Sequence, residues 1–480
     1  MSARTHRPRL ARITLAVLVG VSACSTLPTF EPEKVLAATP TGNPQLESAR
    51  GPLSPEQSKA VLARLAARAP DTGIFERHLA IEEAVVGSPL TVGNQVTLLQ
   101  DGPATYAAMF EAIEAARDHI NLQTYILDDD EVGRRFADAL IAKQKKGVQV
   151  NVIHDSVGTL FTPKEFFKRM TDVGIKVLEF NPVNPKNARK GWEINQRDHR
   201  KLLVVDGKVA FLGGINISSV YSSGSFGRSG SSGGSGSSGG GGGKVAPGKD
   251  GHAWRDTHIR LQGPVVTEFQ RLFFGTWKKQ KGEPLPDRMY FPPQQQVGNQ
   301  VVRAIGSSPD DPYALIYATL LSAIGSAETS VHITMAYFAP DPQLLASLEA
   351  AAQRGVDVTL ILPSQSDAWL IFHAGRRFYH SLLKAGVKIY ERRGVILHSK
   401  TAVIDGVWAT VGSTNLDWRS FLHNDELNAV VLGADFGRQM EAMFAKDLEA
   451  SQQVTLQQWK QRPLKNRVKE AFASIWEYWL

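Results

Sequence analysis

The stretch His199-Arg-Lys201-Leu-Leu-Val-Val-Asp206 has a second copy in the same chain, His398-Ser-Lys400-Thr-Ala-Val-Ile-Asp405. In both copies Lys stands two residues after His, and Asp stands seven residues after it. Each copy continues to a pair of small residues and then to an Asn, at Asn216 and Asn415. Two copies with one internal spacing predict a single active site that is built from two half-sites.

The residue types of this pattern suit a phosphate ester. In a β-strand, His and Lys at positions i and i+2 project from the same face, and the apolar residues that follow them are typical of a buried strand. Imidazole can attack phosphorus or protonate a leaving oxygen. Lys and Asn can hold the non-bridging oxygens, and a carboxylate can orient the imidazole. A single His-x-Lys pair is usually a strand edge without function, but the duplication argues against that alternative.

A longer repeat surrounds the two motifs. The segments 147–153 and 174–179 recur as 355–361 and 386–391, so the second half follows the first by about 210 residues. Strands that alternate with helical segments indicate βα units. We therefore expect an α/β protein with two similar halves, each a mostly parallel, helix-covered sheet. The halves are expected to pack face to face, with one active site at the seam.

The two motifs resemble the phospholipase D superfamily, whose hallmark is two HxKxxxxD motifs per active site. The similarity is narrower to the bacterial cardiolipin synthase branch and runs from about residue 75 to the C-terminus. The segments that carry this narrower resemblance are Gly93–Leu99, Ile120–Ile126, Asp128–Asp130, Arg197–Lys201, Trp254–His258, Gly263-Pro264 and Ala336–Pro340.

This resemblance implies a phosphatidyltransferase that acts through a phosphohistidine, most simply a cardiolipin synthase that makes cardiolipin and glycerol from two phosphatidylglycerols. His199 would attack phosphorus and His398 would act as general acid, although the two roles can be exchanged. A phospholipase D-type hydrolase or a periplasmic nuclease would use the same site with water as acceptor. A scaffold without activity would not need both copies of the motif.

The candidate site residues form two groups. The catalytic candidates are His199, Lys201, Asp206, His398, Lys400 and Asp405, and the substrate-binding candidates are Asn216, Asn415, Asp256 and Glu426. By repeat position Asp256 is the counterpart of Glu426, and these two are the better candidates to orient a His. Asp206 and Asp405 are more consistent with bracing the turn after the motif strand. Tyr125 and Tyr337 follow equivalent strands and either line the cavity or belong to the core.

The first 23 residues are typical of a bacterial secretion signal. Four Arg precede an apolar run at 13–21 that is too short to cross a bilayer. The ending Val-Ser-Ala-Cys24 resembles a lipobox, in which the Cys is lipidated; a plain secretory cleavage site is the alternative. Since Ser25 rather than Asp follows, the family's sorting rule favours a lipid anchor at the periplasmic face of the outer membrane over the inner membrane.

Net charge and cysteine content limit the kinds of partner and cross-link that the chain can have. The formal net charge is +7, and removal of residues 1–23, with four Arg and no Lys or acid, leaves +3. This small excess of charge argues against a nucleic-acid partner, whereas the family resemblance implies a phosphatidylglycerol-like phospholipid substrate and the lipobox implies a membrane surface. One Cys excludes a disulfide within a monomer, and one chain suffices for a complete site. We expect no metal or other cofactor, because His154 beside Asp155 has no further ligand at suitable spacing.

The domain organisation follows from these patterns. Residues 1–23 are the signal, 24–74 a tether with a short helix that begins after Ser54 and ends near Ala69, 75–290 the first half and 291–480 the second. A Gly/Ser tract at 222–243 is expected to be disordered. It is either a mobile flap over the lipid entrance or a surface expansion without a role in activity, and we favour the second.

The C-terminal segment has the pattern of an amphipathic helix. It either lies at an anionic bilayer surface or packs on its own domain. Its apolar face comprises Val468, Phe472, Ile475, Trp476 and Trp479, and its basic residues are Lys460, Arg462, Lys465, Arg467 and Lys469.

Overall fold

The computed structural model describes residues 27, 29–38, 44–69, 71–184, 193, 195–224 and 253–476. The predictions for the signal peptide, for Cys24, for residues 25, 26, 28 and 39–43 of the tether, for the Gly/Ser tract from residue 225 onward and for Trp479 lie outside these residues. Within the described ranges, no helix combines the length and the apolar composition that a bilayer crossing requires.

The first half contains a sheet with the strand order β3–β11–β9–β8–β4–β5–β6. Only β4, β5 and β6 run parallel to one another. The bounds are β3 (Leu90–Gln100), β4 (His119–Thr124), β5 (Gln149–Asp155), β6 (Lys176–Phe180), β8 (Leu202–Val205), β9 (Val209–Gly213) and β11 (Thr257–Gln262).

The second half repeats this order as β12–β21–β19–β18–β13–β15–β16, with β22 added at the edge. The parallel strands are again the three of the βα units, β13, β15 and β16. The bounds are β12 (Gln300–Ser307), β13 (Ser330–Met335), β15 (Asp357–Pro363), β16 (Lys388–Arg392), β18 (Lys400–Ile404), β19 (Trp408–Gly412), β21 (Asn424–Leu432) and β22 (Ser451–Val454).

The predicted α/β class with two similar halves is confirmed, but the expectation of mostly parallel sheets is wrong: each sheet is mixed, with parallel pairs only among the strands of its βα part. The motif strands β8 and β18 cause the difference, because each turns back into a hairpin with β9 or β19. Asp206 and Gly207 have φ angles of 51° and 61°, and Asp405 and Gly406 have 51° and 63°. Positive φ at two successive residues is the geometry of a tight hairpin turn, which Asp-Gly favours.

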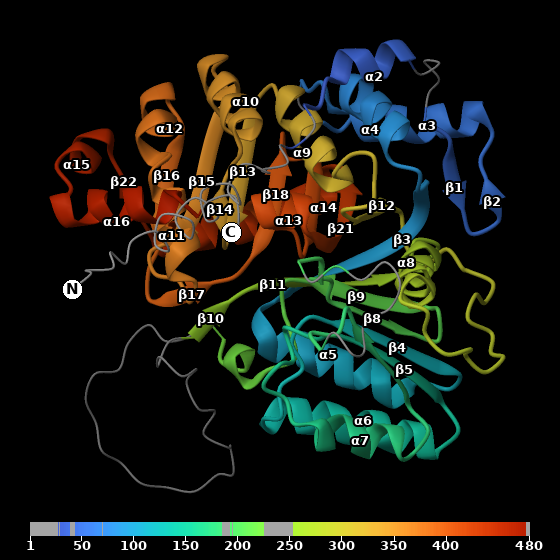
Figure 1. The fold of residues 1–480 in the computed structure, drawn as a ribbon. Helices are drawn as coiled ribbons and strands as arrows, with labels where there is room; N and C mark the ends of the chain where they lie inside the picture. Colours follow the sequence, from blue (N-terminus) through green and yellow to red (C-terminus); the bar gives the residue numbers. More distant parts are fainter. Residues whose placement is uncertain are drawn as a thin grey trace, which may run out of the picture.

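Helices and sheets alternate in layers (Figure 1). The helices α5 (Asp101–Ala115), α6 (Glu131–Lys145) and α7 (Lys164–Thr171) cover the outer face of the first sheet. On the second sheet the outer layer is α9 (Leu315–Gly325), α10 (Pro342–Gln353) and α12 (Tyr379–Ala385). Between the sheets lie α8 (Val266–Lys279) and α14 (Ala434–Glu449).

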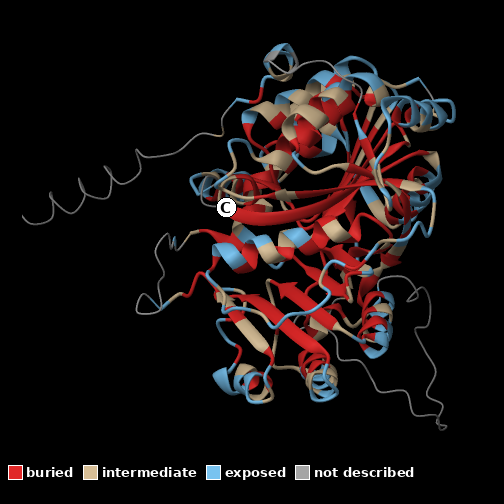
Figure 2. Ribbon diagram, turned by 90° about the vertical axis from the view of Figure 1, so that its right-hand side faces the viewer, coloured by how far each residue is buried: buried red, intermediate tan, exposed pale blue. Residues whose placement is uncertain are grey.

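One apolar core joins the two halves. It contains Leu202 and Val204 from the first motif strand together with Val403 from the second. Strand β3 also belongs to both sheets, because its beginning pairs with β12 and its end pairs with β11. Buried backbone is continuous across this region (Figure 2). The halves are therefore one packed unit, and the motif strands lie at its centre.

The N-terminal described segment packs on the second half. It consists of α2 (Pro32–Ala38), the short strands β1 (Leu46–Ser48) and β2 (Gly51–Pro52), α3 (Pro55–Ala66), a π-helical turn (Ile74–His78) and α4 (Leu79–Val85). Phe30, Leu62 and Ile74 are buried in the outer core of the second half. The predicted helix start is confirmed, since Ser54 and Gln57 form a capping box. The helix ends at Ala66 rather than near Ala69.

Candidate active site

The two motif His residues line one pocket between the halves. The pocket encloses about 1040 Å³, including its open mouth. Residues from both halves alternate around its wall: Tyr125, Ile126, Arg197, His199, Asn216, Tyr221 and Trp254 from the first, and Tyr337, Asp367, Ala368, Ile371, His398, Asn415, Asp417, Arg419, Ser420 and Asn424 from the second.

Two short parallel pairings between the halves place the His residues. Strand β7 (Arg197–Asp198) pairs with the beginning of β21, and the backbone N–H of His199 donates to the carbonyl of Asp425 at 2.9 Å. In the equivalent pairing, β17 (Val395–Leu397) runs beside β10 (Ala253–Arg255), and the N–H of His398 donates to the carbonyl of Arg255 at 2.8 Å. Each His therefore lies beside the residue that follows this carbonyl in the opposite half.

The residue after Asp425 is Glu426, and the residue after Arg255 is Asp256. These two acids were predicted to be counterparts of each other. His199 Nδ1 lies 3.0 Å from Glu426 Oε1, and His398 Nδ1 lies 2.7 Å from Asp256 Oδ2. All four side chains are buried. Because a carboxylate accepts from the Nδ1–H of each ring, Nε2 is the nitrogen left for chemistry in both imidazoles.

The small residues after each motif make room for these carboxylates. Ser413 Oγ donates to Glu426 Oε2 at 2.5 Å. At the equivalent position Gly214 faces Asp256 so closely that a Cβ would lie 2.1 Å from Asp256 Oδ1. The matching small-residue pairs in the sequence thus have a steric cause that spacing alone does not reveal.

The Lys residues have matching surroundings. Lys201 Nζ donates to the carbonyl of His199, and Lys400 Nζ donates to the carbonyl of His398, each at 2.5 Å. The ring of Tyr125 lies 5.3 Å from Lys201 Nζ and that of Tyr337 lies 5.7 Å from Lys400 Nζ, measured to the ring centroids. Both Tyr residues line the pocket, as one of the two alternatives for them predicted.

The Asn residues differ between the halves. Asn216 accepts from the N–H of Ile126 at 3.2 Å and donates to the Tyr221 hydroxyl at 2.9 Å. Asn415 Oδ1 is buried without a hydrogen-bond partner in the part of the chain that the structure describes. Both Asn line the pocket, but the first amide is largely held by its own half. The two half-sites are therefore not equivalent toward a substrate.

The motif Asp residues brace the hairpins. Asp206 accepts from the backbone N–H groups of residues 117, 118 and 119, at 2.8 to 3.0 Å for the shortest bond of each. Asp405 accepts from those of residues 328, 329 and 330 at 2.8 to 3.0 Å. In the described chain the imidazoles are held by Asp256 and Glu426, and the motif Asp residues tie each hairpin turn to the beginning of β4 or β13.

Asp206→Ala should lower stability more than chemistry. The loss of the carboxylate leaves three backbone N–H groups at one turn without their acceptor, and Ala tolerates the positive φ poorly, so we expect about 2 kcal/mol less free energy of unfolding. Urea unfolding measures this cost, and turnover is compared per folded molecule at low temperature. Asp206→Asn is the matched control, because Asn keeps one acceptor and tolerates the turn. A loss of turnover per folded enzyme as large as that of Lys201→Ala would assign Asp206 to catalysis instead.

Burial and neighbouring cations determine the protonation of the site. Burial, with Lys201 and Lys400 second and third, holds the pKa of His199 well below its ordinary value. Burial and Lys400 also lower the pKa of His398, but Asp256 and Asp367 oppose that shift. His199 is thus the harder imidazole to protonate.

Burial shifts the pKa values of three further buried groups. It raises the pKa of Glu426 to about 7, and it lowers the pKa of Lys201 to about 7 and that of Lys400 to about 8. Proton exchange among these groups therefore falls in the physiological range.

The alkaline side of the pH profile should report the two Lys. Only a protonated amine stabilises phosphoryl oxygens, so the empty site loses positive charge as pH rises through about 7 to 8. We expect kcat/KM for the lipid donor to fall in that range. Lys201→Arg and Lys400→Arg keep their charge, so the fall should move to higher pH even where turnover at pH 7 is reduced. A profile unchanged in both variants would contradict the assignment.

Tyr221 and Asp367 have no clear signal in the sequence, and Trp254 was noted only as part of a segment that carries the family resemblance. Trp254 and Tyr221 pack on His398, with ring centroids at 5.3 Å and 5.7 Å. Asp367 lines the pocket and accepts from the Tyr337 hydroxyl at 2.9 Å. None has a counterpart in the motif repeat, and Asp367 follows the end of β15 in a loop that differs from the equivalent loop after β5. Only its position after a parallel strand could have indicated it.

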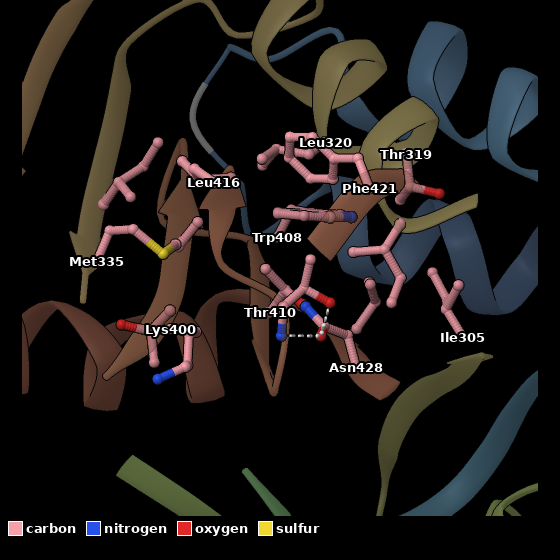
Figure 3. Close-up of a pocket in the computed structure, with 16 residues that line it drawn as sticks. Ile305, Thr319, Leu320, Met335, Lys400, Trp408, Thr410, Leu416, Phe421 and Asn428 are labelled. Carbon is pink, nitrogen blue, oxygen red and sulfur yellow. Dashed lines mark hydrogen bonds between the residues drawn. The ribbon is translucent and has the colours of Figure 1, made fainter. Parts of the chain in front are cut away.

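A second cavity, of about 450 Å³, lies behind the second motif strand (Figure 3). Met335, Trp408, Leu416 and Phe421 make its lining mostly apolar, and Lys400 lies at its edge. This apolar surrounding is part of the burial that lowers the pKa of Lys400.

His154 lies outside the pocket. It stacks on Phe167 at 4.0 Å, and its Nδ1 pairs with the Thr159 hydroxyl at 2.8 Å. Among the residues with described positions, no three His, Cys, Asp or Glu side chains are grouped so as to hold a metal ion.

A duplicated α/β unit that brings two His residues into one pocket, each with its motif Lys bonded to the carbonyl of that His, defines an enzyme that transfers a phosphoryl group between two oxygens. Comparison with known proteins agrees with this class. The family model described as "Cardiolipin synthase, PLD-like domain" matches residues 109–223 and 320–448. The chain belongs to the phospholipase D superfamily, in its cardiolipin synthase branch.

Curated relatives support the branch over most of the chain. The cardiolipin synthase of Alkalihalophilus pseudofirmus is 34% identical over 392 residues, which cover 81% of this chain and 73% of that protein. The major cardiolipin synthase of Bacillus subtilis is 34% identical over 391 residues, 80% of this chain and 75% of that protein. A solved phosphatidylserine synthase of Haemophilus influenzae shares the fold, with a TM-score of 0.57 at 14% identity, over 82% of this chain and 98% of that one.

Proposed function

We propose that the protein is a cardiolipin synthase that transfers a phosphatidyl group from one phosphatidylglycerol to the glycerol hydroxyl of another. The observation that carries the mechanism is the crossed pair of contacts, in which each His is held at Nδ1 by a carboxylate of the opposite half. Both rings line one pocket, so one can attack phosphorus while the other handles the proton of the exchanging oxygen.

The proposed first step forms a phosphohistidine. His199 Nε2 attacks phosphorus, the bond from phosphorus to the glycerol oxygen breaks, and protonated His398 gives its proton to that oxygen. The low pKa of His199 and the support of His398 by Asp256 and Asp367 favour this division of roles. Lys201, Lys400 and Asn415 are proposed to hold the non-bridging oxygens, with Asn216 as a positioning residue for Tyr221.

In the second step His398 takes the proton of the acceptor hydroxyl, whose oxygen attacks phosphorus. The bond from phosphorus to His199 breaks, and cardiolipin leaves. The reaction exchanges one phosphodiester for another, so it needs no external energy source and no redox partner.

The test is the product formed from phosphatidylglycerol vesicles by the purified full chain. We expect cardiolipin and glycerol in equal amounts. Phosphatidic acid as the main product would replace the proposal by a hydrolase, and cleavage of DNA in a parallel assay would replace it by a nuclease. His398→Ala should abolish all three activities and serves as the blank.

Asp367→Asn should shift the balance between transfer and hydrolysis. The carboxylate lines the pocket, is held by Tyr337 and acts electrostatically on His398, so we propose that it accepts hydrogen bonds from the glycerol hydroxyls. The variant should raise the KM for acceptor lipid several-fold and increase the share of phosphatidic acid. Product ratios by lipid chromatography measure this. A proportional fall of both products would assign Asp367 to support of His398 alone.

The cellular position is proposed from the N-terminal sequence. Cys24 is proposed to be lipidated after removal of residues 1–23, which would attach the enzyme to the periplasmic face of the outer membrane. Labelled palmitate should enter the wild-type protein and not Cys24→Ser, and membrane fractionation should recover the labelled protein with the outer membrane. If the wild-type protein took up no label, the proposed lipidation of Cys24 would be wrong. If the labelled protein were recovered with the inner membrane, the proposed outer-membrane position would be wrong.

A further inference from the structure

Two exposed apolar clusters, one in each half, lie next to structural elements that line the pocket. The first, the loop cluster, is Val157, Leu160 and Phe161; the second, the helix cluster, is Trp369, Leu464, Val468, Phe472, Ile475 and Trp476. We propose that both clusters insert into the surface of an anionic phospholipid bilayer and hold the pocket mouth at the level of the headgroups. This inference rests on the proposed lipid substrate and adds the surface through which the enzyme reaches it.

The loop cluster is held outward by a well-bonded loop. Asp155 Oδ1 accepts from the N–H of Val157 at 2.8 Å, and the Thr162 hydroxyl donates to the carbonyl of Leu127 at 2.7 Å. Phe161 is 95% exposed despite these anchors. A fixed loop that presents a fully exposed Phe does not gain stability from that side chain, so its exposure indicates a contact with something outside the fold.

This loop packs directly behind Tyr125, which lines the pocket. Gly158 backs onto Tyr125 so closely that a Cβ would lie 2.0 Å from the Tyr125 carbonyl oxygen. Tyr125 in turn packs edge-on against His199, with ring centroids 5.2 Å apart. A chain of direct contacts therefore links the loop to the catalytic His through Tyr125.

The helix cluster lies on the other half, against a helix that lines the pocket. Helix α16 (Leu464–Ser474) buries Glu470 and Ala473 and exposes the opposite apolar stripe. It packs against α11 (Trp369–Arg376), and the rings of Trp369 and Phe472 lie 6.4 Å apart. Ile371 of α11 lines the pocket. The apolar stripe predicted from the sequence therefore faces outward for the residues described, and it packs on a helix whose buried face lines the pocket.

Charge selects a bilayer as the occupant. Lys460, Lys465, Arg467 and Lys469 are exposed around the helix cluster. Among the described residues from 456 to 476 the one acid, Glu470, is buried and bonded to Arg462 at 2.7 Å, and Glu477 follows in the sequence beyond the described residues. Apolar side chains with uncompensated cations around them are the pattern of a surface that binds anionic lipid. A second copy of the chain would bring the same cations together and be repelled.

The pocket lining fits this arrangement. His, Arg, Asp and Asn side chains line the pocket, with few aliphatic ones. Such a lining suits a phosphoglycerol headgroup, while the acyl chains stay in the bilayer. Insertion of the two clusters on either side would bring headgroups to the mouth without extraction of a whole lipid.

The test compares two physical forms of one substrate. The full chain and its variants are assayed on phosphatidylglycerol vesicles and on dihexanoyl phosphatidylglycerol below its micelle concentration. We expect Leu160→Ser with Phe161→Ser, and Val468→Ser with Phe472→Ser, each to lower turnover on vesicles about tenfold and to change turnover on the soluble substrate less than about twofold. Equal effects on both substrates, or no effect on vesicles, would overturn the proposal.

Met289→Ser is the matched control. Met289 is also an exposed large apolar residue, but its neighbour Tyr290 packs on His119, at the beginning of β4 and thus at the end of the sheet away from the pocket. It should leave both activities unchanged. All variants keep the same N-terminus, so any lipid anchor contributes equally to each.

Fluorescence separates failure of docking from failure of the proposed function. Vesicles with brominated phosphatidylglycerol should quench Trp369 and Trp476, and the quenched fraction should fall in Trp369→Phe and Trp476→Phe. Quenching without cardiolipin formation would support the docking surface and contradict the proposed cardiolipin synthesis. Cardiolipin formation without quenching would support the proposed cardiolipin synthesis and contradict the docking surface.

Discussion

His199→Ala should prevent any covalent intermediate, whereas His398→Ala should form one and fail to release it. Both variants should lose transfer from phosphatidylglycerol by roughly 10⁴-fold or more, because each removes a group that takes part in bond making or proton transfer. The two losses become distinguishable with a nitrophenyl phosphodiester, whose leaving group departs without a proton. On that substrate His398→Ala should give a burst of nitrophenol close to one per enzyme, and His199→Ala should give none.

Mass spectrometry of the trapped protein checks this result. A phosphoryl adduct on the peptide that contains residue 199 is expected in His398→Ala. An adduct on residue 398 in His199→Ala, with none in the other variant, would exchange the two roles. Wild-type enzyme serves as the control, since its intermediate turns over and should show a burst followed by steady release.

Glu426→Gln and Asp256→Asn should each disable the His of the opposite half. An amide of the same shape keeps the geometry but cannot stabilise an imidazolium and favours the wrong tautomer. We therefore expect kcat to fall roughly 10²- to 10⁴-fold with little change in KM. On the nitrophenyl substrate Glu426→Gln should slow the burst, because it acts on His199. Asp256→Asn should keep the burst and slow the release, as His398→Ala does.

The comparison with Asp206→Asn provides the control for this second prediction, because Asp206 bonds only to backbone groups among the contacts described. Its effect should appear in unfolding and not in the burst. If Asp256→Asn slowed the burst and Glu426→Gln slowed the release, the proposed His roles would be reversed. If both variants left the burst and the release unchanged, the crossed contacts would have no catalytic meaning.

The chemistry of the site was predictable from local patterns. His and Lys two residues apart in a strand must share a face. An Asp-Gly pair at the end of an apolar strand favours a hairpin turn, so each motif could be placed on a strand that ends in a turn. The match of Asp256 with Glu426 by repeat position was also sufficient to select them as orienting residues. The capping box at Ser54 and the stripe of α16 are further local patterns of this kind.

Local sequence patterns could not predict the contacts between the two halves. Strand pairing of β7 with β21 joins residues more than 220 positions apart, and its register decides that Glu426 meets His199 rather than His398. The sheet is mixed because hairpins follow the motif strands, a feature that a repeat of βα units does not reveal. Asp367 was not predicted, because the loop that carries it differs in sequence from the equivalent loop after β5 in the first half.

The sequence by itself determined the reacting groups, their duplication and the strands that carry them, because these depend on residue type and on short spacing. Only the tertiary structure decided which carboxylate serves which His, how far burial shifts the pKa values of Lys201 and Lys400, and which apolar residues remain outside the core. Those properties depend on register, on dielectric surroundings and on exposure, and each of these is set by residues that are distant in the chain and adjacent in space.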